Sequence, residues 1–187
     1  MNIIIIGCGR MGQGIAITFA LAGYKIQLID IKKRSNDNFT NLLIKINAEI
    51  YKNLKILNKI KLINKIKIKK ITSNIEIIQY WSNENIINSA DIIFECVPEK
   101  LKIKKNVFKL LSENTNKKTI ISSTTSTILS TDLAKYNRHP ERFLNAHWLN
   151  PPYLMPLIEI SPCTETSKSN IKKIYNLFIK IGKVPII

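Results

Sequence analysis

The chain contains few of the residues that would point to a secreted, membrane-bound or metal-dependent protein. Its three cysteines, Cys8, Cys96 and Cys163, are odd in number and widely spaced, which argues against a disulfide framework and fits a reducing compartment. No apolar run is long enough to span a bilayer, and the first one starts too early to leave room for a signal peptide. We therefore expect a cytoplasmic protein with no membrane partner and no metal.

Acidic residues are also scarce. Thirteen Asp and Glu residues stand against 29 Lys and Arg residues, which gives a formal net charge of +16. Such an excess is typical of nucleic-acid binders, but here the lysines alternate with isoleucine and asparagine along the whole chain, as in residues 52–70. An AT-rich coding sequence produces this uniform bias, so nucleic-acid binding is not favoured. A basic surface still suits a polyanionic substrate handle, such as coenzyme A or an acidic carrier protein.

The first sixteen residues, MNIIIIGCGRMGQGIA, carry the motif on which the interpretation depends. Residues 2–6 are apolar and β-branched, as in a strand buried within a parallel sheet. Gly7, Gly9 and Gly12 follow as G-x-G-x-x-G and lead into a helix. Gly7 permits a tight turn, Gly9 lets a pyrophosphate approach the backbone, and Gly12 lets the helix pack closely on the sheet. The free N–H groups at the helix start then face an anion.

A second strand-like run, residues 25–29, ends in Asp30, eighteen residues after Gly12. A carboxylate at this strand end can accept hydrogen bonds from the adenosine ribose hydroxyls, and it repels a 2′-phosphate. This predicts NAD as the cofactor rather than NADP. Lys32, Lys33 and Arg34 follow closely and offset part of that repulsion.

The remaining chain alternates between strand and helix patterns. Apolar residues at three- and four-residue spacing over residues 36–65 predict a long helix or helical hairpin, which is longer than a crossover needs and is expected to project towards substrate or a partner. The other predicted strands are 66–71, 90–97, 119–123, 143–147 and 157–160, and the other predicted helices are 85–89, 101–111, 131–134 and 169–181. This order predicts an α/β fold of the Rossmann type: a doubly wound, mostly parallel sheet with a long helical insertion after the second strand.

The sequence has only two histidines, and one of them ends a predicted strand. His139 precedes Pro140 in a charged loop and is expected at the surface, whereas His147 lies at the ligand side of the sheet. Counting symmetrically about Tyr153, a hairpin-like return brings Glu159 opposite His147. A carboxylate bonded to one imidazole nitrogen fixes the tautomer and leaves the other nitrogen free to transfer a proton near neutral pH. We therefore predict an acid–base pair.

Four stretches, in order, resemble the NAD-binding domain of L-3-hydroxyacyl-CoA dehydrogenases, including 3-hydroxybutyryl-CoA dehydrogenases. They are GCGRMGQGIA with Asp30, ECVPEKLKIKKNVF, SSTTSTILSTDLA and HPERFLNAHWLNPPYLMPLIEI, and they span nearly the full chain. The resemblance implies that His147 is the catalytic acid/base, Glu159 its orienting partner, Asn150 a substrate-positioning amide and Ser126 a hydroxyl that bonds the substrate 3-oxygen. It also implies a cofactor-binding set, with the last two on the nicotinamide side: Gly7, Gly9, Arg10, Met11, Gly12, Asp30, Glu99 and Lys104.

The chain also departs from the family pattern. Thr124 stands where the family usually has asparagine. Lys100 stands where an asparagine commonly follows the glutamate, which is Glu99 in this chain. Residues 34–65 do not clearly reproduce the family's coenzyme A contacts. Family members continue beyond the equivalent of residue 187 into a helical domain that completes the acyl pocket and forms the dimer. The resemblance therefore implies that residues 1–187 are the NAD-binding domain alone, and a homodimer or a separate helical-domain partner is expected.

The leading hypothesis is an NAD-dependent dehydrogenase of 3-hydroxyacyl thioesters carried on coenzyme A or an acyl carrier protein. Other β-hydroxyacid dehydrogenases use a catalytic lysine on a later helix and would not need His147. The sequence stretch NPPYLMPLIE also resembles the corresponding stretch of related dehydrogenases that act on gulonate and carnitine. A different class, an NAD-binding module without independent catalysis, predicts cofactor binding without turnover. A nucleic-acid binder would have to retain DNA or RNA at moderate salt.

Overall fold

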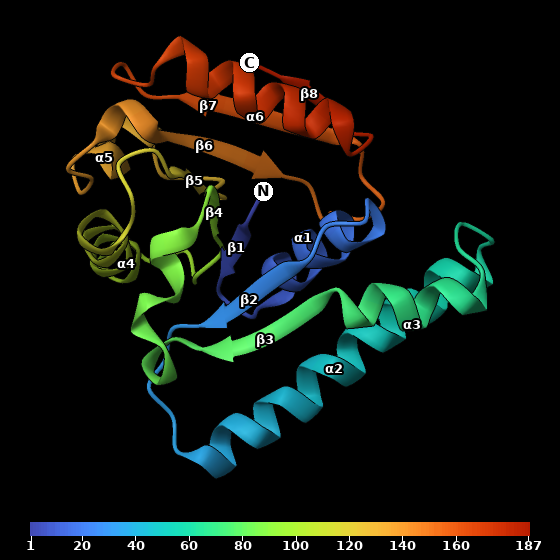
Figure 1. The fold of residues 1–187 in the computed structure, drawn as a ribbon. Helices are drawn as coiled ribbons and strands as arrows, with labels where there is room; N and C mark the ends of the chain where they lie inside the picture. Colours follow the sequence, from blue (N-terminus) through green and yellow to red (C-terminus); the bar gives the residue numbers. More distant parts are fainter.

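The computed structural model describes all 187 residues, which form one sheet covered by helices on both faces (Figure 1). The strand order is β3-β2-β1-β4-β5-β6-β7-β8, and neighbouring strands pair in parallel except β6 and β7. The first six strands of this order are those of a doubly wound dinucleotide-binding sheet, which confirms the predicted fold class. The strands are β1 (Ile3–Ile6), β2 (Ile26–Asp30), β3 (Ile75–Gln79), β4 (Ile92–Glu95), β5 (Ile120–Ser123), β6 (Phe143–Trp148), β7 (Leu157–Pro162) and β8 (Val184–Ile186).

Alternate side chains of the strands enter two separate cores. In β1, Ile3 and Ile5 join the larger core beneath α1, α2, α3 and α6, whereas Ile4 and Ile6 join the smaller core beneath α4 and α5. Both faces of β1 are therefore buried, which explains its unbroken apolar run. The helices are α1 (Arg10–Leu21), α2 (Asn36–Lys59), α3 (Lys65–Ser73), α4 (Leu101–Asn114), α5 (Ser130–Ala134) and α6 (Lys168–Lys180), with 3-10 turns η1 (Tyr80–Ser82), η2 (Glu84–Ser89) and η3 (Pro140–Arg142).

The strand predicted over residues 66–71 is wrong, because this stretch belongs to α3. The alternation of isoleucine and lysine suggests a strand, yet Ile68 and Ile71, three residues apart, are the buried positions of a helix. The Asn64 side chain caps the helix by accepting a hydrogen bond from the Lys67 N–H at 3.0 Å. The third strand is β3, which follows α3, and the short edge strand β8 was not predicted.

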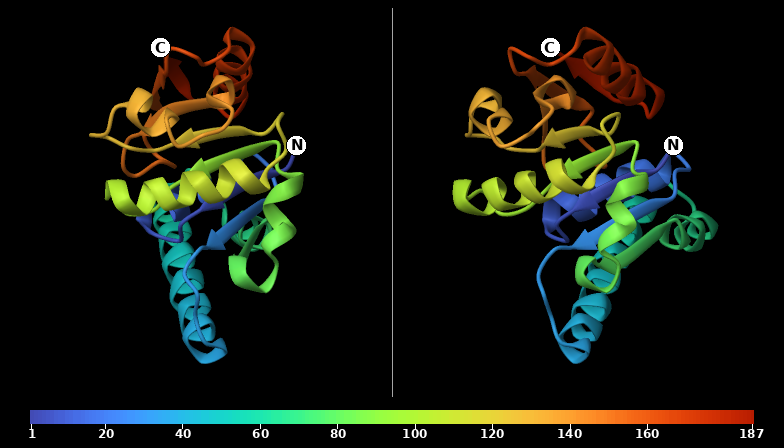
Figure 2. Two further views of the ribbon diagram at one scale, coloured as in Figure 1. Left: turned by 90° about the vertical axis from the view of Figure 1, so that its left-hand side faces the viewer. Right: turned by 60° about the vertical axis from the view of Figure 1, so that its left-hand side comes forward.

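The helical insertion after the second strand is present as α2 and α3. The side chains of Ile46, Ile50, Leu54 and Leu57 bury one face of α2 in the larger core. The first turns of α2 extend beyond the β3 edge of the sheet, as predicted (Figure 2). No helix is both long and apolar enough to cross a membrane.

Four parallel strands end at one edge of the sheet. β1 ends just before Gly7, β2 ends at Asp30, β4 at Glu95 and β5 at Ser123. The sheet order reverses between β1 and β4, and ligands of doubly wound folds bind in the crevice at this point.

Candidate active site

The glycine loop between β1 and α1 is shaped by close backbone contacts. Gly7 has a φ of +110°, and a Cβ there would lie 2.6 Å from the Cys96 carbonyl oxygen at the end of β4. A Cβ on Gly12 would lie 1.9 Å from the Gly7 carbonyl oxygen, so the start of α1 can approach β1 only without a side chain. Nothing lies within 4 Å of the corresponding position on Gly9. Gly9 therefore presents open backbone, as close approach of a pyrophosphate requires.

A cleft of about 600 Å³, which we call the glycine-loop cleft, lies over the ends of β1, β2, β4 and β5. Gly12 is buried within α1 and does not line this cleft, and the fully buried Lys104 does not line it either. Open backbone at Gly9, the N-terminus of α1 and a carboxylate at the end of β2 are the features that fit a dinucleotide. The predicted residues that line the cleft are Gly7, Gly9, Arg10, Met11, Asp30, Glu99 and Ser126.

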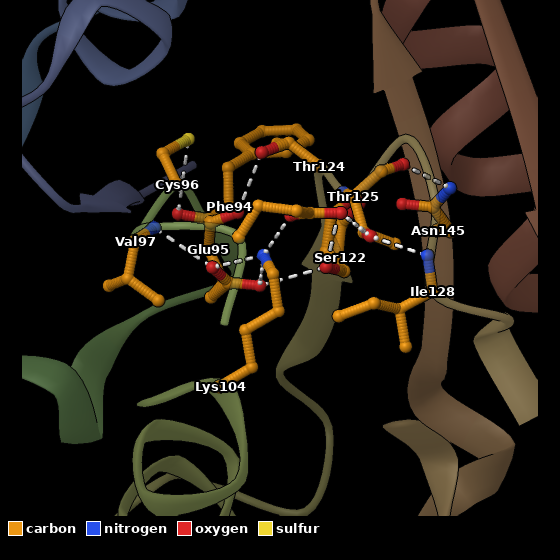
Figure 3. Close-up of polar contacts among 12 residues, drawn as sticks. Phe94, Glu95, Cys96, Val97, Lys104, Ser122, Thr124, Thr125, Ile128 and Asn145 are labelled. Atoms are coloured by element: carbon orange, nitrogen blue, oxygen red, sulfur yellow. Dashed lines mark hydrogen bonds and ion pairs between the residues drawn. The ribbon is translucent and has the colours of Figure 1, made fainter. Parts of the chain in front are cut away.

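A buried ion pair lies below this cleft (Figure 3). The Lys104 Nζ atom is 2.8 and 2.9 Å from the two Glu95 carboxylate oxygens, and neither residue is exposed. Glu95 also accepts hydrogen bonds from the Ser123 hydroxyl at 2.8 Å and the Val97 N–H at 2.8 Å. Burial raises the pKa of the Glu95 carboxyl, and the Lys104 ammonium opposes that shift. Glu95 was not among the predicted site residues, although an acid in an otherwise apolar strand is a signal for a buried polar contact.

Glu99 connects this pair to the loop after β5. Its carboxylate lies 3.3 Å from Lys104 Nζ and accepts hydrogen bonds from the Thr125 and Thr127 hydroxyls and from the Ser126 N–H. Partial burial alone would raise the pKa of Glu99, but the Thr125 hydroxyl and the Lys104 charge outweigh it and lower the pKa. Lys104 therefore does not line the cleft itself but contacts Glu99, which does. Glu99 in turn fixes the backbone that carries Ser126.

His147 and Glu159 face each other across β6 and β7. They are a register pair of the antiparallel strands, and His147 Nδ1 lies 2.7 Å from Glu159 Oε2. The pairing predicted by symmetry about Tyr153 is therefore confirmed. An ionised carboxylate can only accept a hydrogen bond, so Glu159 assigns the proton to Nδ1 and leaves the Nε2 lone pair free. The side chains are 27% and 45% exposed, so they remain open to a ligand.

The loop that carries Ser126 is anchored on the same strand as His147. Asn145, two residues before His147 and on the same face of β6, donates a hydrogen bond from Nδ2 to the Thr125 carbonyl oxygen at 3.0 Å (Figure 3). Ser126 is exposed, and no hydrogen bond occupies its hydroxyl. Asn145 was not among the predicted site residues, and it ties this loop to the strand that carries His147.

Asn150 lines a second cleft of about 640 Å³, which we call the α2 cleft. It lies between α2 and the loop after β6, and it shares Cys8, Gly9, Arg10 and Leu42 with the glycine-loop cleft. His147 and Glu159 line neither cleft, and no hydrogen bond joins them to Asn150 or Ser126. The remaining lining residues of the α2 cleft are Gln13, Lys45, Ile46, Glu49, Lys52, Asn53, Pro151, Pro152 and Tyr153.

The loop after β6 is held in place from two sides. The buried Lys183 donates hydrogen bonds to the carbonyl oxygens of Pro152, at 2.5 Å, and Met155, at 2.8 Å. Burial lowers the pKa of Lys183. On the other side the Pro152 ring packs on Gly14 of α1, where a Cβ would lie 2.5 Å from Pro152 Cδ. This wall of the α2 cleft is therefore tied both to the glycine helix and to the end of α6.

A doubly wound sheet with a glycine loop at its switch point defines a dinucleotide-binding domain. The family described as "3-hydroxyacyl-CoA dehydrogenase, NAD binding domain" matches residues 2–187. The chain belongs to this family, which confirms the resemblance in its sequence and supports NAD as the cofactor.

Individual relatives agree with this assignment. The chain is 33% identical over 186 residues to the 3-hydroxybutyryl-CoA dehydrogenase of Clostridioides difficile, covering all of this chain and 63% of that protein. It is 31% identical to the lambda-crystallin homolog of Mus musculus, covering 99% of this chain and 56% of that protein. The crystal structure of (S)-3-hydroxybutyryl-CoA dehydrogenase from Ralstonia eutropha superimposes with a TM-score of 0.88 at 26% identity, covering 99% of this chain and 62% of that one. The chain thus spans somewhat more than half the length of these relatives.

Proposed function

We propose that this chain is the NAD-binding, proton-transferring domain of an enzyme that interconverts 3-hydroxyacyl thioesters and their 3-oxo forms. The observation that carries the proposal is the His147–Glu159 pair, 2.7 Å apart across β6 and β7, with the Ser126 loop anchored on β6. NAD bound in the glycine-loop cleft supplies hydride transfer, which no side chain can perform.

His147 is the acid/base of this proposal. With Nδ1–H donated to Glu159, Nε2 can take the proton of a substrate hydroxyl during oxidation and return it to the 3-oxygen during reduction. Glu159 stabilises the imidazolium formed when Nε2 is protonated. We propose that the Ser126 hydroxyl bonds the same substrate oxygen and that the Asn150 amide positions the acyl portion.

The α2 cleft is the proposed site of the thioester and its handle. It adjoins the glycine-loop cleft at Gly9, so a substrate there can meet the cofactor. Arg10, Lys45 and Lys52 line it, whereas its one acid, Glu49, accepts a hydrogen bond from Gln13 at 2.7 Å. This positive balance suits a phosphate-bearing handle. Both coenzyme A and an acyl carrier protein provide one.

The test compares wild-type chain with His147→Gln. We expect wild type to oxidise NADH with acetoacetyl-CoA, and the variant to lose activity by about 10²–10⁴-fold because the general acid is gone. NADH affinity should not change, since His147 lies outside the glycine-loop cleft. His139→Gln is the matched control, because His139 lies in the loop before η3 and its only charged contact is Glu141. Undiminished turnover in His147→Gln would refute the histidine mechanism.

A second candidate is an NAD-binding module that needs a further domain for turnover. The chain spans only 63% of the Clostridioides difficile dehydrogenase, and the His147–Glu159 pair is partly open to solvent. A homodimer or a helical-domain partner would cover the pair. In this case the wild-type chain binds NADH but does not reduce acetoacetyl-CoA, and adding the partner domain restores turnover.

A further inference from the structure

The end of the glycine-loop cleft at Asp30 carries two cations. The Nε–H of Arg34 donates to the Asp30 carboxylate, and the backbone N–H of Lys32 donates to the same carboxylate at 3.4 Å. Arg34 and Lys32 both line the cleft beside Asp30. A carboxylate alone at this position would select against a 2′-phosphate. Here the Arg34 guanidinium pairs with that carboxylate, and the Lys32 side chain adds a second positive charge to the lining of the cleft.

Arg34 is held in this position by the strand next to β2. Gln79, the register partner of Asp30 at the end of β3, donates from Nε2 to the Arg34 carbonyl oxygen at 3.4 Å. The Trp81 indole N–H donates to the Ile31 carbonyl oxygen at 2.9 Å. The loop after β2 is therefore tied to β3 and η1 at two points, which directs the Arg34 side chain back onto Asp30.

The guanidinium has unused donors. Its only hydrogen bond is the one from Nε to Asp30, so the N–H groups on both Nη atoms have no protein acceptor. The Arg34 side chain is 27% exposed, so these groups can reach a ligand in the cleft. A guanidinium with free donors at the ribose end of a dinucleotide site is the usual means of accepting a 2′-phosphate.

We propose that Arg34, assisted by Lys32, forms a 2′-phosphate subsite, so that this chain binds NADP(H) as well as NAD(H). Asp30 accepts the ribose hydroxyls of NAD, and the free guanidinium N–H groups bind the additional phosphate of NADP. Arg34 is then the residue that sets the ratio of the two affinities. The inference rests on the glycine-loop cleft being the dinucleotide site.

The experiment titrates wild-type chain and two variants with NADH and with NADPH, following the nucleotide fluorescence. The dissociation constant of wild type for NADPH should lie within about tenfold of that for NADH. Arg34→Gln should raise the NADPH constant by about tenfold or more, because a hydrogen-bonded charge pair is lost, and leave the NADH constant within about twofold. Lys33→Gln removes one positive charge from the adjacent residue as a control. It should leave the ratio of the NADPH and NADH dissociation constants unchanged, since Lys33 lies outside the cleft and over the Trp81 ring.

Three results would overturn the inference. The first is wild type that binds NADH but excludes NADPH by more than about a hundredfold. The second is an NADPH-to-NADH ratio that does not change in Arg34→Gln. The third is an equal loss in Lys33→Gln, which would assign the effect to net charge. If neither nucleotide binds, the assignment of the glycine-loop cleft as the dinucleotide site would be refuted instead. Thermal unfolding of each variant serves as the control that the variant is folded.

Discussion

Gly9 and Gly12 lie in one loop but are required for different reasons. Gly12 faces backbone, with the Gly7 carbonyl oxygen 1.9 Å from where a Cβ would lie, so its constraint is part of the folded protein. Gly9 has φ −74° and nothing within 4 Å, so alanine fits there in the free protein. The need for glycine at position 9 arises only when a pyrophosphate lies against the backbone.

Alanine substitutions should separate these two roles. Gly12→Ala should lower the free energy of unfolding by about 1–3 kcal/mol or more, because α1 must move away from β1. Gly9→Ala should leave thermal unfolding unchanged and weaken NADH binding by about tenfold or more, close to 1.4 kcal/mol. Differential scanning calorimetry and an NADH titration measure the two effects. Normal NADH affinity in a stable Gly9→Ala protein would show that the pyrophosphate lies elsewhere.

At the scale of elements, α4 is joined to β4 by charge as well as by apolar packing. The Lys104 ammonium on α4 meets the Glu95 carboxylate at the end of β4, and both are fully buried. A buried charge that loses its partner is strongly destabilising. This pair also supports Glu99 and therefore the Ser126 loop.

Lys104→Met should lower the free energy of unfolding by about 3–5 kcal/mol, because the Glu95 charge is left buried and unpaired. Lys102 lies on the exposed side of the same helix, so Lys102→Met should change the free energy of unfolding by no more than about 0.5 kcal/mol. Adding Glu95→Gln to Lys104→Met removes the unpaired charge and should recover part of the loss. Urea unfolding measures all three variants. A double variant no more stable than Lys104→Met would mean that packing, not charge, accounts for the loss.

The elements that could be predicted from the sequence are those with a single dominant signal. β1 is an unbroken apolar run, and the pairing of His147 with Glu159 follows from the length of one hairpin. The I-K-I-K stretch of α3 fits both the strand and the helix periodicity, so the sequence alone predicts a strand, and packing against α2 and α1 decides for the helix. The edge strand β8 is three residues long and contains Pro185, so it carries no strand signal.

The site could be predicted only where residues act in sequence-local motifs. The glycine loop, the position of Asp30 at the end of β2 and the contact between His147 and Glu159 are such cases, and their roles stay predictions. Glu95 and Asn145 bond to residues that are 28 and 20 positions away, and no spacing rule indicates those contacts. Their polar side chains within buried strands were the available signal, since a buried polar group needs a partner.

For the whole molecule, the question is whether a net charge of +16 has a function or only reflects composition. Lysines cover much of the surface, and most of them contact no acid. Charges at the α2 cleft are different, because Lys45 and Lys52 line a cavity that adjoins the glycine-loop cleft. Lys69 and Lys70 on α3 are equally exposed but line neither cleft.

Two double variants with the same net charge can separate local from global attraction. Lys45→Gln with Lys52→Gln should weaken the binding of free coenzyme A, measured by calorimetry, by about tenfold, whereas Lys69→Gln with Lys70→Gln should change it by less than about twofold. The difference should shrink as the ionic strength rises, because salt screens the attraction between these exposed lysines and the phosphates of coenzyme A. Equal losses in both variants would mean that the uniform positive charge attracts the anion and that the α2 cleft is not its binding site. A loss of coenzyme A affinity only in the Lys45 and Lys52 double variant would mean that these two lysines bind the anion locally. The α2 cleft would then be the site where a phosphate-bearing handle binds, next to the glycine-loop cleft.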